Sequence, residues 1–224
     1  MHVILFDIDG TLLLTGGAGQ RGMERALEKV FGVTKPTENI SAAGRTDFAI
    51  THDLFEFHGI DDTPDAWRNF SAEYFRQLPL ALAELDGTVL PGVREILDVL
   101  HSRDDVKLGL LTGNFEAGAW LKLKHYGIDQ YFKFGAFGDS HHCRDDVARI
   151  AYEATHLHCG STIAAERVWV IGDTPADVAC ARAIGANVVA VATGMFSYDE
   201  LAPTSPDLLL HDLSDPETLL ARLV

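Results

Sequence analysis

Short apolar runs recur along the chain and are separated by longer stretches in which apolar residues follow helical spacing. The first run covers residues 2–6 and ends abruptly in polar and glycine residues. A run of this kind is typical of a strand that is buried on both faces of a parallel sheet. Further strands of the same type are predicted at residues 106–111, 168–171, 188–191 and 208–210.

Helical patterns lie between these runs. Apolar residues three or four positions apart occur at Val93, Ile96, Leu97 and Leu100, at Ala119, Leu123 and Tyr126, and at Val147, Ile150, Ala151 and Ala154. Another helix is predicted to begin at Pro175, because proline is tolerated in the first turn. Strands that alternate with helices predict a doubly wound, Rossmann-like parallel sheet of the α/β class.

The stretch from about Leu14 to Gly87 breaks this alternation. It carries helical patterns near residues 23–31, 48–57 and 66–85 and no convincing strand. Glycine and proline at residues 15–19 and 86–92 are typical of flexible junctions. We therefore predict an all-helical cap domain, residues 15–87, hinged on a core formed by residues 1–14 and 88–224.

Composition narrows the choice of partners. The 224 residues are 47% hydrophobic, enough for a well-packed core, and 33 acidic against 18 basic side chains give a formal net charge of -15. This charge disfavours nucleic acid and anionic membranes. A small anionic substrate is still compatible with it, because a metal ion and a few local cations can reverse the field inside one cleft.

The location and assembly of the protein are less strongly indicated. No apolar run reaches membrane-spanning length. Cys143, Cys159 and Cys180 are unpatterned and are expected to be reduced thiols in a cytoplasmic protein. We expect a monomer or a homodimer.

Polar segments follow three of the predicted strands, at residues 7–11, 112–114 and 172–177. Ligands of open α/β sheets bind at the carboxyl ends of strands. Asp7 follows its strand directly, and Asp9 lies two residues further on beside Gly10, so both carboxylates can stand above the sheet. An ionised carboxylate can attack phosphorus while a protonated one donates to the leaving oxygen, and neighbouring carboxylates tend to differ in pKa.

The second segment suits a phosphoryl group. The Thr112 hydroxyl and the backbone N–H groups of Gly113 and Asn114 can hold its oxygens. Together with Gly10 and Thr11 of the first segment, Gly113 and Asn114 are expected to contact the substrate.

The third segment suits a metal. Asp173 and Asp177 supply carboxylate oxygens, the hard ligands that Mg²⁺ prefers. The three segments together predict a magnesium-dependent phosphoryl-transfer site.

These segments resemble the haloacid dehalogenase superfamily, whose motifs include D-x-D-G-T, a strand-ending Thr or Ser, and G-D-x-x-x-D. The resemblance covers the whole chain in order. It implies that Asp7 is the nucleophile and a metal ligand, and that Asp9 is the general acid/base and a metal ligand through its backbone carbonyl. It further implies that Thr112 binds phosphate, that Asp173 binds Mg²⁺ and that Asp177 supports the metal.

The family also has a Lys or Arg that neutralises the phosphoryl charge, usually at the start of the helix before the last motif. The familiar Lys-Pro form is absent here. Arg144, just before a predicted helix, is our candidate for this residue, and Arg149 is the alternative.

Two further features bear on the substrate. The dehalogenase branch usually lacks an acid at the position of Asp9, so Asp9 points to phosphate esters. The helical insert resembles the cap of the phosphoglycolate-phosphatase-like branch, where cap residues choose the substrate. There, Arg45 can make a bidentate contact with a carboxylate or second anionic group. The alternatives for Arg45 are a surface charge or an ion pair with Asp47.

Our main hypothesis is hydrolysis of a small phosphomonoester, such as phosphoglycolate, a sugar phosphate or a nucleoside monophosphate. The alternatives are a phosphomutase of the same architecture and a non-catalytic module that binds a phosphorylated metabolite. A phosphonatase would need an amine from the cap, and Lys29 and Lys35 are not specifically placed for that role.

Overall fold

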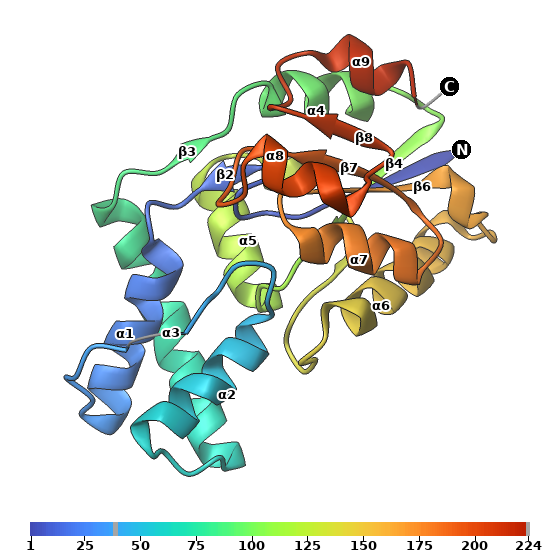
Figure 1. Cartoon of the computed structure of the whole chain (residues 1–224). Coiled ribbons are helices and arrows are strands. Elements are labelled where there is room, and N and C mark those ends of the chain that lie inside the picture. Colours follow the sequence, from blue (N-terminus) through green and yellow to red (C-terminus); the bar gives the residue numbers. More distant parts are fainter. Residues whose placement is uncertain (38–39, 223–224) are drawn as a thin grey trace.

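The computed structural model describes residues 1–37 and 40–222 and is built around a six-stranded parallel sheet (Figure 1). The order of the strands is β5-β4-β1-β6-β7-β8. Their bounds are β1 His2–Phe6, β4 Val106–Leu111, β5 Gly135–Ala136, β6 Val168–Gly172, β7 Asn187–Val191 and β8 Leu208–Leu210. The five predicted strands are therefore present, to within one residue at each end. β5 was not predicted, since two residues are too short to carry a pattern.

Helices cover both faces of the sheet, which confirms the doubly wound α/β class. They are α4 Val93–His101, α5 Glu116–His125, α6 Arg144–Cys159, α7 Pro175–Ala183, α8 Tyr198–Leu201 and α9 Pro216–Leu220. Alternate residues of β1 enter two separate cores. Ile4 and Phe6 pack in the cluster that contains α4 and α5 residues, whereas Val3 and Leu5 pack in the cluster that contains α6 and α7 residues.

The insert contributes a third apolar cluster, formed by α1 Ala18–Phe31, α2 Asp47–His58 and α3 Pro64–Glu84. Thr46 and Thr63 cap α2 and α3 by accepting hydrogen bonds from the backbone three residues on. Where the insert joins the core, β2 Leu13–Leu14 pairs antiparallel with β3 Thr88–Val89, a contact that the sequence pattern did not reveal. The fold is thus a Rossmann-like core with a helical cap, while the domain limits of 15 and 87 stay a prediction.

The first turn of α2 is bound to loops of the core. Three hydrogen bonds make this contact: Asp47 N–H to the Gly113 carbonyl at 2.6 Å, Phe48 N–H to the Gly138 carbonyl at 3.3 Å and the Thr46 hydroxyl to the His141 carbonyl at 2.6 Å. The cap therefore lies directly over the carboxyl ends of the strands.

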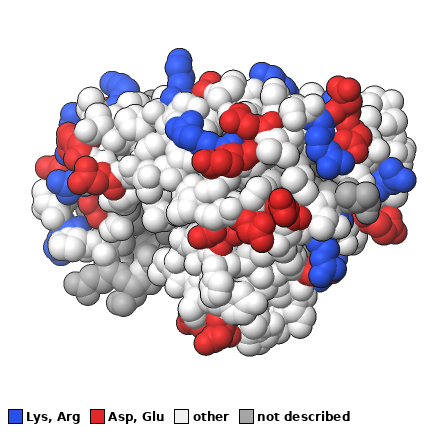
Figure 2. Space-filling model, turned by 90° about the horizontal axis from the view of Figure 1, so that it is seen from above, with Lys and Arg blue, Asp and Glu red and all other residues white. Residues whose placement is uncertain are grey.

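The surface carries both signs of charge. On the face shown in Figure 2, basic side chains are scattered among acidic ones rather than gathered in one patch. Within residues 1–37 and 40–222, no helix is long and apolar enough to cross a membrane. The three cysteines are free thiols.

Candidate active site

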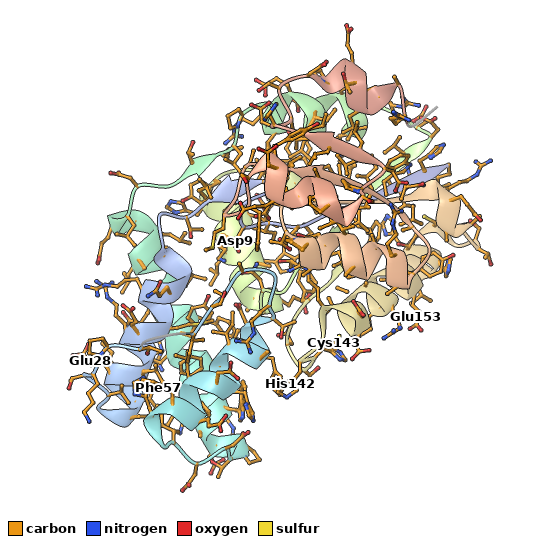
Figure 3. The ribbon with its side chains drawn as sticks, in the orientation of Figure 1. Asp9, Glu28, Phe57, His142, Cys143 and Glu153 are labelled. Atoms are coloured by element: carbon orange, nitrogen blue, oxygen red, sulfur yellow. The ribbon has the colours of Figure 1, made fainter. Side chains whose placement is uncertain are left out.

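A pocket of about 570 Å³ lies between the carboxyl ends of the central strands and the helices of the cap. Figure 3 shows Asp9 in the space between the sheet and the insert. Asp7, Gly113 and Asp173, from the three predicted polar segments, all line this pocket. The topology explains why they meet, because β1 pairs with both β4 and β6 in parallel.

Three carboxylates form a tight cluster at one end of the pocket. Asp7 follows β1, Asp173 follows β6, and Asp177 lies in the first turn of α7. One oxygen from each lies within 4.8 Å of the others, and all three side chains are buried. The Thr11 hydroxyl donates a hydrogen bond to Asp173 at 3.1 Å. Thr11 thus orients a carboxylate instead of lining the pocket.

Arg144 is the cation of this cluster. Its Nη2 lies 3.0 Å from Oδ1 of Asp7 and 2.5 Å from Oδ1 of Asp177. Its Nε is buried and has no partner among the residues that the structure describes. Arg149 instead lies on the surface and pairs with Asp146. Of the two arginines considered from the sequence, only Arg144 therefore reaches the carboxylates.

Both carboxylate oxygens of Asp177 accept hydrogen bonds. While Oδ1 accepts from Arg144, Oδ2 accepts from the Thr174 backbone at 2.9 Å and from the Thr174 hydroxyl at 2.7 Å. The backbone bond to Oδ2, together with the bond from the Asp177 N–H group to the Thr174 hydroxyl at 3.3 Å, forms a capping box that begins α7. The side chain is fully buried, so it is not the solvated first-turn acid that its position in the sequence also allowed.

The cluster resists full ionisation. Burial raises the pKa of Asp7 to about 6, although the charge of Arg144 pulls it down. Burial, and then the neighbouring charges of Asp177 and Asp7, raise the pKa of Asp173 to about 8. Three carboxylates that share one arginine favour a bound proton or a bound cation.

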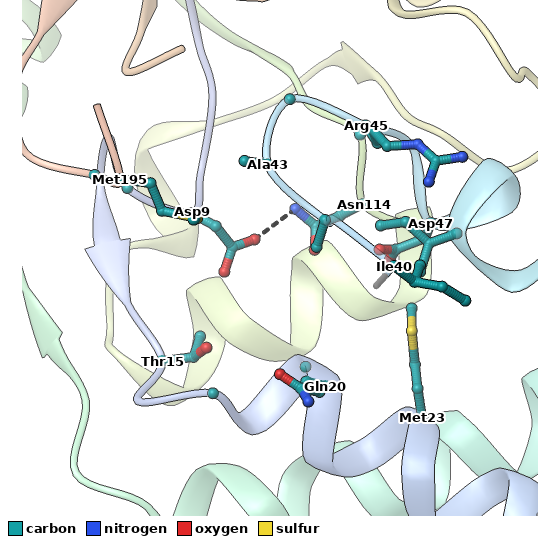
Figure 4. Close-up of a pocket in the computed structure, with 18 of the residues that line it drawn as sticks. Asp9, Thr15, Gln20, Met23, Ile40, Ala43, Arg45, Asp47, Asn114 and Met195 are labelled. Carbon is teal, nitrogen blue, oxygen red and sulfur yellow. Dashed lines mark hydrogen bonds between the residues drawn. The ribbon is translucent and has the colours of Figure 1, made fainter. Parts of the chain in front are cut away.

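Asp9 points in a different direction, toward Asn114 (Figure 4). Its Oδ2 accepts from Nδ2 of Asn114 at 2.8 Å and from Nζ of Lys122 at 2.6 Å. Lys122 also donates to Oδ1 of Asn114 at 2.6 Å and is only 4% exposed. Burial alone would lower the pKa of Lys122, but the charges of Asp9 and Asp47 raise it overall.

Sequence reasoning missed Lys122. The signal was available, because Lys122 lies three residues after Ala119 and four before Tyr126, on the apolar face of the predicted helix. A lysine on the buried face of a helix requires a partner. Asp9 and Asn114 are those partners.

Thr112 and Gly10 fix the backbone around the pocket. The Thr112 hydroxyl is fully buried and accepts from the Asn114 backbone at 3.3 Å and side chain at 2.8 Å. Gly10 has a φ of 82°, and a Cβ there would lie 2.3 Å from Oδ2 of Asp173. Only glycine allows the first segment to pass so close to the cluster.

Asp47 was also missed as a functional candidate. It is buried at the start of α2, lines the pocket and accepts from the Phe115 backbone at 2.8 Å. Burial raises the pKa of Asp47 to about 6, against the opposing charge of Lys122. Asp47 therefore links the cap to the core through its backbone and its side chain.

Arg45 lies at the edge of the pocket, and its guanidinium points away from Asp9 (Figure 4). The ion pair with Asp47 that the sequence suggested is wrong. Arg45 pairs with Asp53 at 2.7 Å, since the buried Asp47 carboxylate faces the core. The Arg45 charge is thereby compensated within α2.

The parallel sheet, the carboxylate cluster at its carboxyl edge and the helical cap define a class of α/β proteins with an acidic site under a helical insert. The model of the haloacid dehalogenase-like hydrolases matches residues 1–185, and the chain belongs to this family. The membership confirms the resemblance seen in the motifs. The chain is thus a hydrolase of the haloacid dehalogenase-like type.

Several known proteins are similar over nearly the whole chain. A phosphoglycolate phosphatase of Pseudomonas fluorescens is 27% identical over 95% of this chain and 77% of its own length. A 5'-nucleotidase of Pseudomonas aeruginosa is 26% identical over 94% and 91%. The crystal structure of a predicted phosphoglycolate phosphatase from Haemophilus somnus has a TM-score of 0.72 at 22% identity and covers 98% of both chains. That structural likeness confirms the fold.

Proposed function

We propose that the chain is a magnesium-dependent phosphatase that hydrolyses a small phosphomonoester through an aspartyl-phosphate on Asp7. One observation carries the proposal. The Asp7 carboxylate is buried at the carboxyl end of β1, 3.0 Å from Arg144, within the cluster that includes Asp173. An anionic nucleophile beside a cation and a metal site is the arrangement that phosphoryl transfer needs.

The donor set fits Mg²⁺. The cluster consists of three aspartates and so offers carboxylate oxygens, the ligands that hard divalent cations prefer. Because both Asp177 oxygens already accept hydrogen bonds, we assign direct coordination to Asp7, Asp173 and the Asp9 backbone carbonyl. Asp177 then acts by holding Arg144 in place. When bound, Mg²⁺ would neutralise charge on the transferring phosphoryl group.

In the first step, an Asp7 oxygen attacks phosphorus, and the bond between phosphorus and the ester oxygen breaks. The Asp9 carboxyl group gives its proton to the departing oxygen, which leaves as an alcohol. In the second step, a water oxygen attacks the same phosphorus and transfers a proton to Asp9. Inorganic phosphate leaves, and the Asp7 carboxylate is restored.

The phosphoryl oxygens would be held by donors from β4 and α6. We assign this role to the backbone N–H group of Gly113 and to the unpartnered Nε of Arg144, since the Thr112 N–H group already donates to the Ala136 carbonyl at 3.2 Å. Lys122, bound to Asp9, would keep the acid/base carboxylate oriented between catalytic steps.

The names of the relatives support the substrate class. One is a phosphoglycolate phosphatase and another a 5'-nucleotidase, and both names denote enzymes that act on phosphomonoesters. A phosphomutase would share most of these residues. Product analysis separates the two, because a mutase yields an isomeric phosphate and little inorganic phosphate.

The test is hydrolysis of p-nitrophenyl phosphate with and without Mg²⁺. We expect activity that EDTA abolishes and Mg²⁺ restores, and we expect Asp7→Asn to lower kcat by at least about 10⁴-fold. Asp86→Asn is the matched control, since Asp86 is an exposed aspartate in the similar segment Asp86-Gly87-Thr88. Activity that survives both Asp7→Asn and EDTA would refute the proposal.

A further inference from the structure

The cap lines its side of the pocket mainly with apolar side chains. They come from α1, α2 and the segment between them: Met23, Leu27, Ile40, Ile50 and Leu54. Figure 4 shows Met23 and Ile40 extending toward each other across the pocket. A part of a substrate that extends from the phosphoryl site toward these residues therefore meets hydrocarbon, with the uncharged polar side chains of Thr15, Gln20 and Thr37 lining the pocket as well.

No free cation faces this region within residues 1–37 and 40–222. Besides Arg144, which is held by the carboxylate cluster, the basic residues that line the pocket are Lys122 and Arg45. Lys122 is bound to Asp9 and Asn114, and Arg45 is paired with Asp53. The chain has no basic side chain among its remaining residues, which are Glu38, Asn39, Leu223 and Val224.

The cap also adds negative charge to the pocket. Glu24 and Asp47 line it, and Asp47 is buried. A second anionic group on the substrate would lose its hydration here and find carboxylates nearby without a spare cation. A carboxylate or second phosphate on the leaving group is thus disfavoured by both solvation and charge.

One buried polar partner that the cap offers is neutral. Tyr74 lines the pocket from α3, is fully buried, and its hydroxyl has no hydrogen-bond partner among the residues described. Burial raises the pKa of Tyr74 well above its ordinary value, so the hydroxyl stays protonated. An unpartnered buried hydroxyl is suited to an uncharged oxygen or nitrogen of a ligand.

We infer that the leaving group of the physiological phosphomonoester is uncharged and largely apolar, and that it is held by Met23, Leu27, Ile50 and Leu54. This inference rests on the proposed phosphatase function and narrows it. The volume of about 570 Å³ has room for an alkyl or aryl group beyond the phosphate. Phosphoglycolate, whose leaving group carries a carboxylate, is then a poor substrate, although relatives bear its name.

The experiment compares esters that differ by one charge. Benzyl phosphate is paired with 4-carboxybenzyl phosphate, and phosphoglycolamide with phosphoglycolate, at saturating Mg²⁺. We expect kcat/KM to favour the neutral member of each pair by about tenfold or more, as an unpaired buried charge requires. Across ethyl, butyl and hexyl phosphate, kcat/KM is expected to rise about fourfold for each methylene that becomes buried.

A pair of cap variants tests where the leaving group lies. Ile40→Arg places a cation in the pocket from a half-buried position outside the helices. We expect it to raise the ratio of kcat/KM for the charged ester to kcat/KM for the neutral ester by about tenfold. Val33→Arg makes the same change at another half-buried apolar cap residue that does not line the pocket, and should leave the ratio unchanged. Melting temperatures of both variants check that the cap is folded.

The outcomes are distinguishable. Equal or better hydrolysis of the charged esters by the wild type would overturn the inference and leave the phosphatase function standing. An unchanged ratio in a folded Ile40→Arg variant would overturn the assigned position of the leaving group. Failure to release phosphate from any ester, with or without Mg²⁺, would refute the proposed function itself.

Discussion

The two sides of the pocket differ in polarity: the core side is charged and the cap side is largely apolar. On the core side, Asp7, Asp173 and Asp177 are buried close to Arg144, and each carboxylate has a defined partner in Arg144 or Thr11. On the cap side, the pocket meets the same apolar residues that form the core of the three-helix insert, including Met23. Buried charges cost free energy unless they are paired, whereas buried apolar groups stabilise the fold directly.

This difference indicates that the core side serves catalysis and the cap side serves the choice of substrate. The core side keeps unfavourable charge in a fixed geometry, which suits the binding of a metal and a phosphoryl group. The cap side can change its shape and polarity without disturbing that charge balance. Substitutions on the core side should therefore change the rate of reaction, and substitutions on the cap side should change which ester reacts.

After loss of the nucleophile Asp7, the largest effect is expected for Arg144→Met, which removes the cation from the core side. Asp7 and Asp177 then lose their shared partner, and one potential phosphate donor is lost. We expect kcat/KM for p-nitrophenyl phosphate to fall by about 10²- to 10³-fold, the range found when a donor to a transition-state charge is removed. Steady-state kinetics at saturating Mg²⁺ measures this.

Arg149→Met is the control for that substitution. Arg149 lies five residues further along α6 but is exposed and pairs with Asp146, so its loss should leave the kinetics and the melting temperature nearly unchanged. Arg144→Met should also destabilise the metal-free protein by about 3–5 kcal/mol, because buried carboxylates lose their counter-charge. Equal behaviour of the two variants would remove the basis for treating the core side as one charged unit.

A smaller effect on kcat is expected for Lys122, which donates a hydrogen bond to Asp9 between the two sides of the pocket. Lys122→Met keeps the length of the side chain and removes two hydrogen bonds, to Asp9 and Asn114. Each charge-assisted bond contributes about 1.5–3 kcal/mol, so a partial loss of Asp9 orientation should lower kcat about tenfold or more and change KM less.

Lys124→Met serves as the comparison, since Lys124 is exposed on the same helix. We expect its kinetics to match those of the wild type. If Lys122→Met also retained full kcat, the Lys122 contact would be a packing feature of α5 with no part in catalysis.

Much of the fold was predictable because its signals are local. The buried strands, such as β1 and β4, are continuous apolar runs, and the helices that cover them have clear periodicity. The strands that were missed, β2, β3 and β5, have two residues each. Elements so short are defined by their pairing partners, which the sequence does not specify.

The site was predictable to the extent that its residues follow strands in recognisable motifs. Asp7, Thr112 and Asp173 are of this kind, and so is the choice of Arg144 at the start of a helix. Lys122 and Asp47 were missed because their roles arise from contacts between segments distant in sequence, Lys122 with Asp9 and Asp47 with Phe115. Such pairings depend on how the cap and α5 pack.

The dependence of protein stability on pH tests whether the core side carries the unfavourable charge. The pKa values of Asp7 and Asp173 are raised to about 6 and about 8, from an ordinary value near 4. Between about pH 4 and pH 8, the native state therefore holds protons that the unfolded chain has released, and the stability of the metal-free protein falls as pH rises. Mg²⁺ replaces those protons, so its stabilising effect should grow with pH.

Thermal unfolding with and without Mg²⁺ measures this effect. At a concentration about 100-fold above Kd, bound Mg²⁺ adds about 2.7 kcal/mol, which corresponds to a rise in Tm of about 5–10 °C. We expect that rise at pH 8.5 and a clearly smaller one at pH 6. Asp173→Asn should abolish it, and an equal shift at both pH values would contradict the assigned coordination by these carboxylates.

The smallest effect is expected for Arg45→Ala at the edge of the cap. Arg45 is paired with Asp53, both side chains are partly exposed, and such pairs contribute at most about 1 kcal/mol. Asp53→Ala breaks the same pair, so the two variants should show the same small decrease in Tm. Because the guanidinium is directed away from Asp9, we expect Arg45→Ala to change kcat/KM by less than about threefold for neutral and carboxylated esters alike. A selective loss on the carboxylated esters would instead show that Arg45 leaves Asp53 to bind substrate, and the cap side would then supply a cation to the substrate.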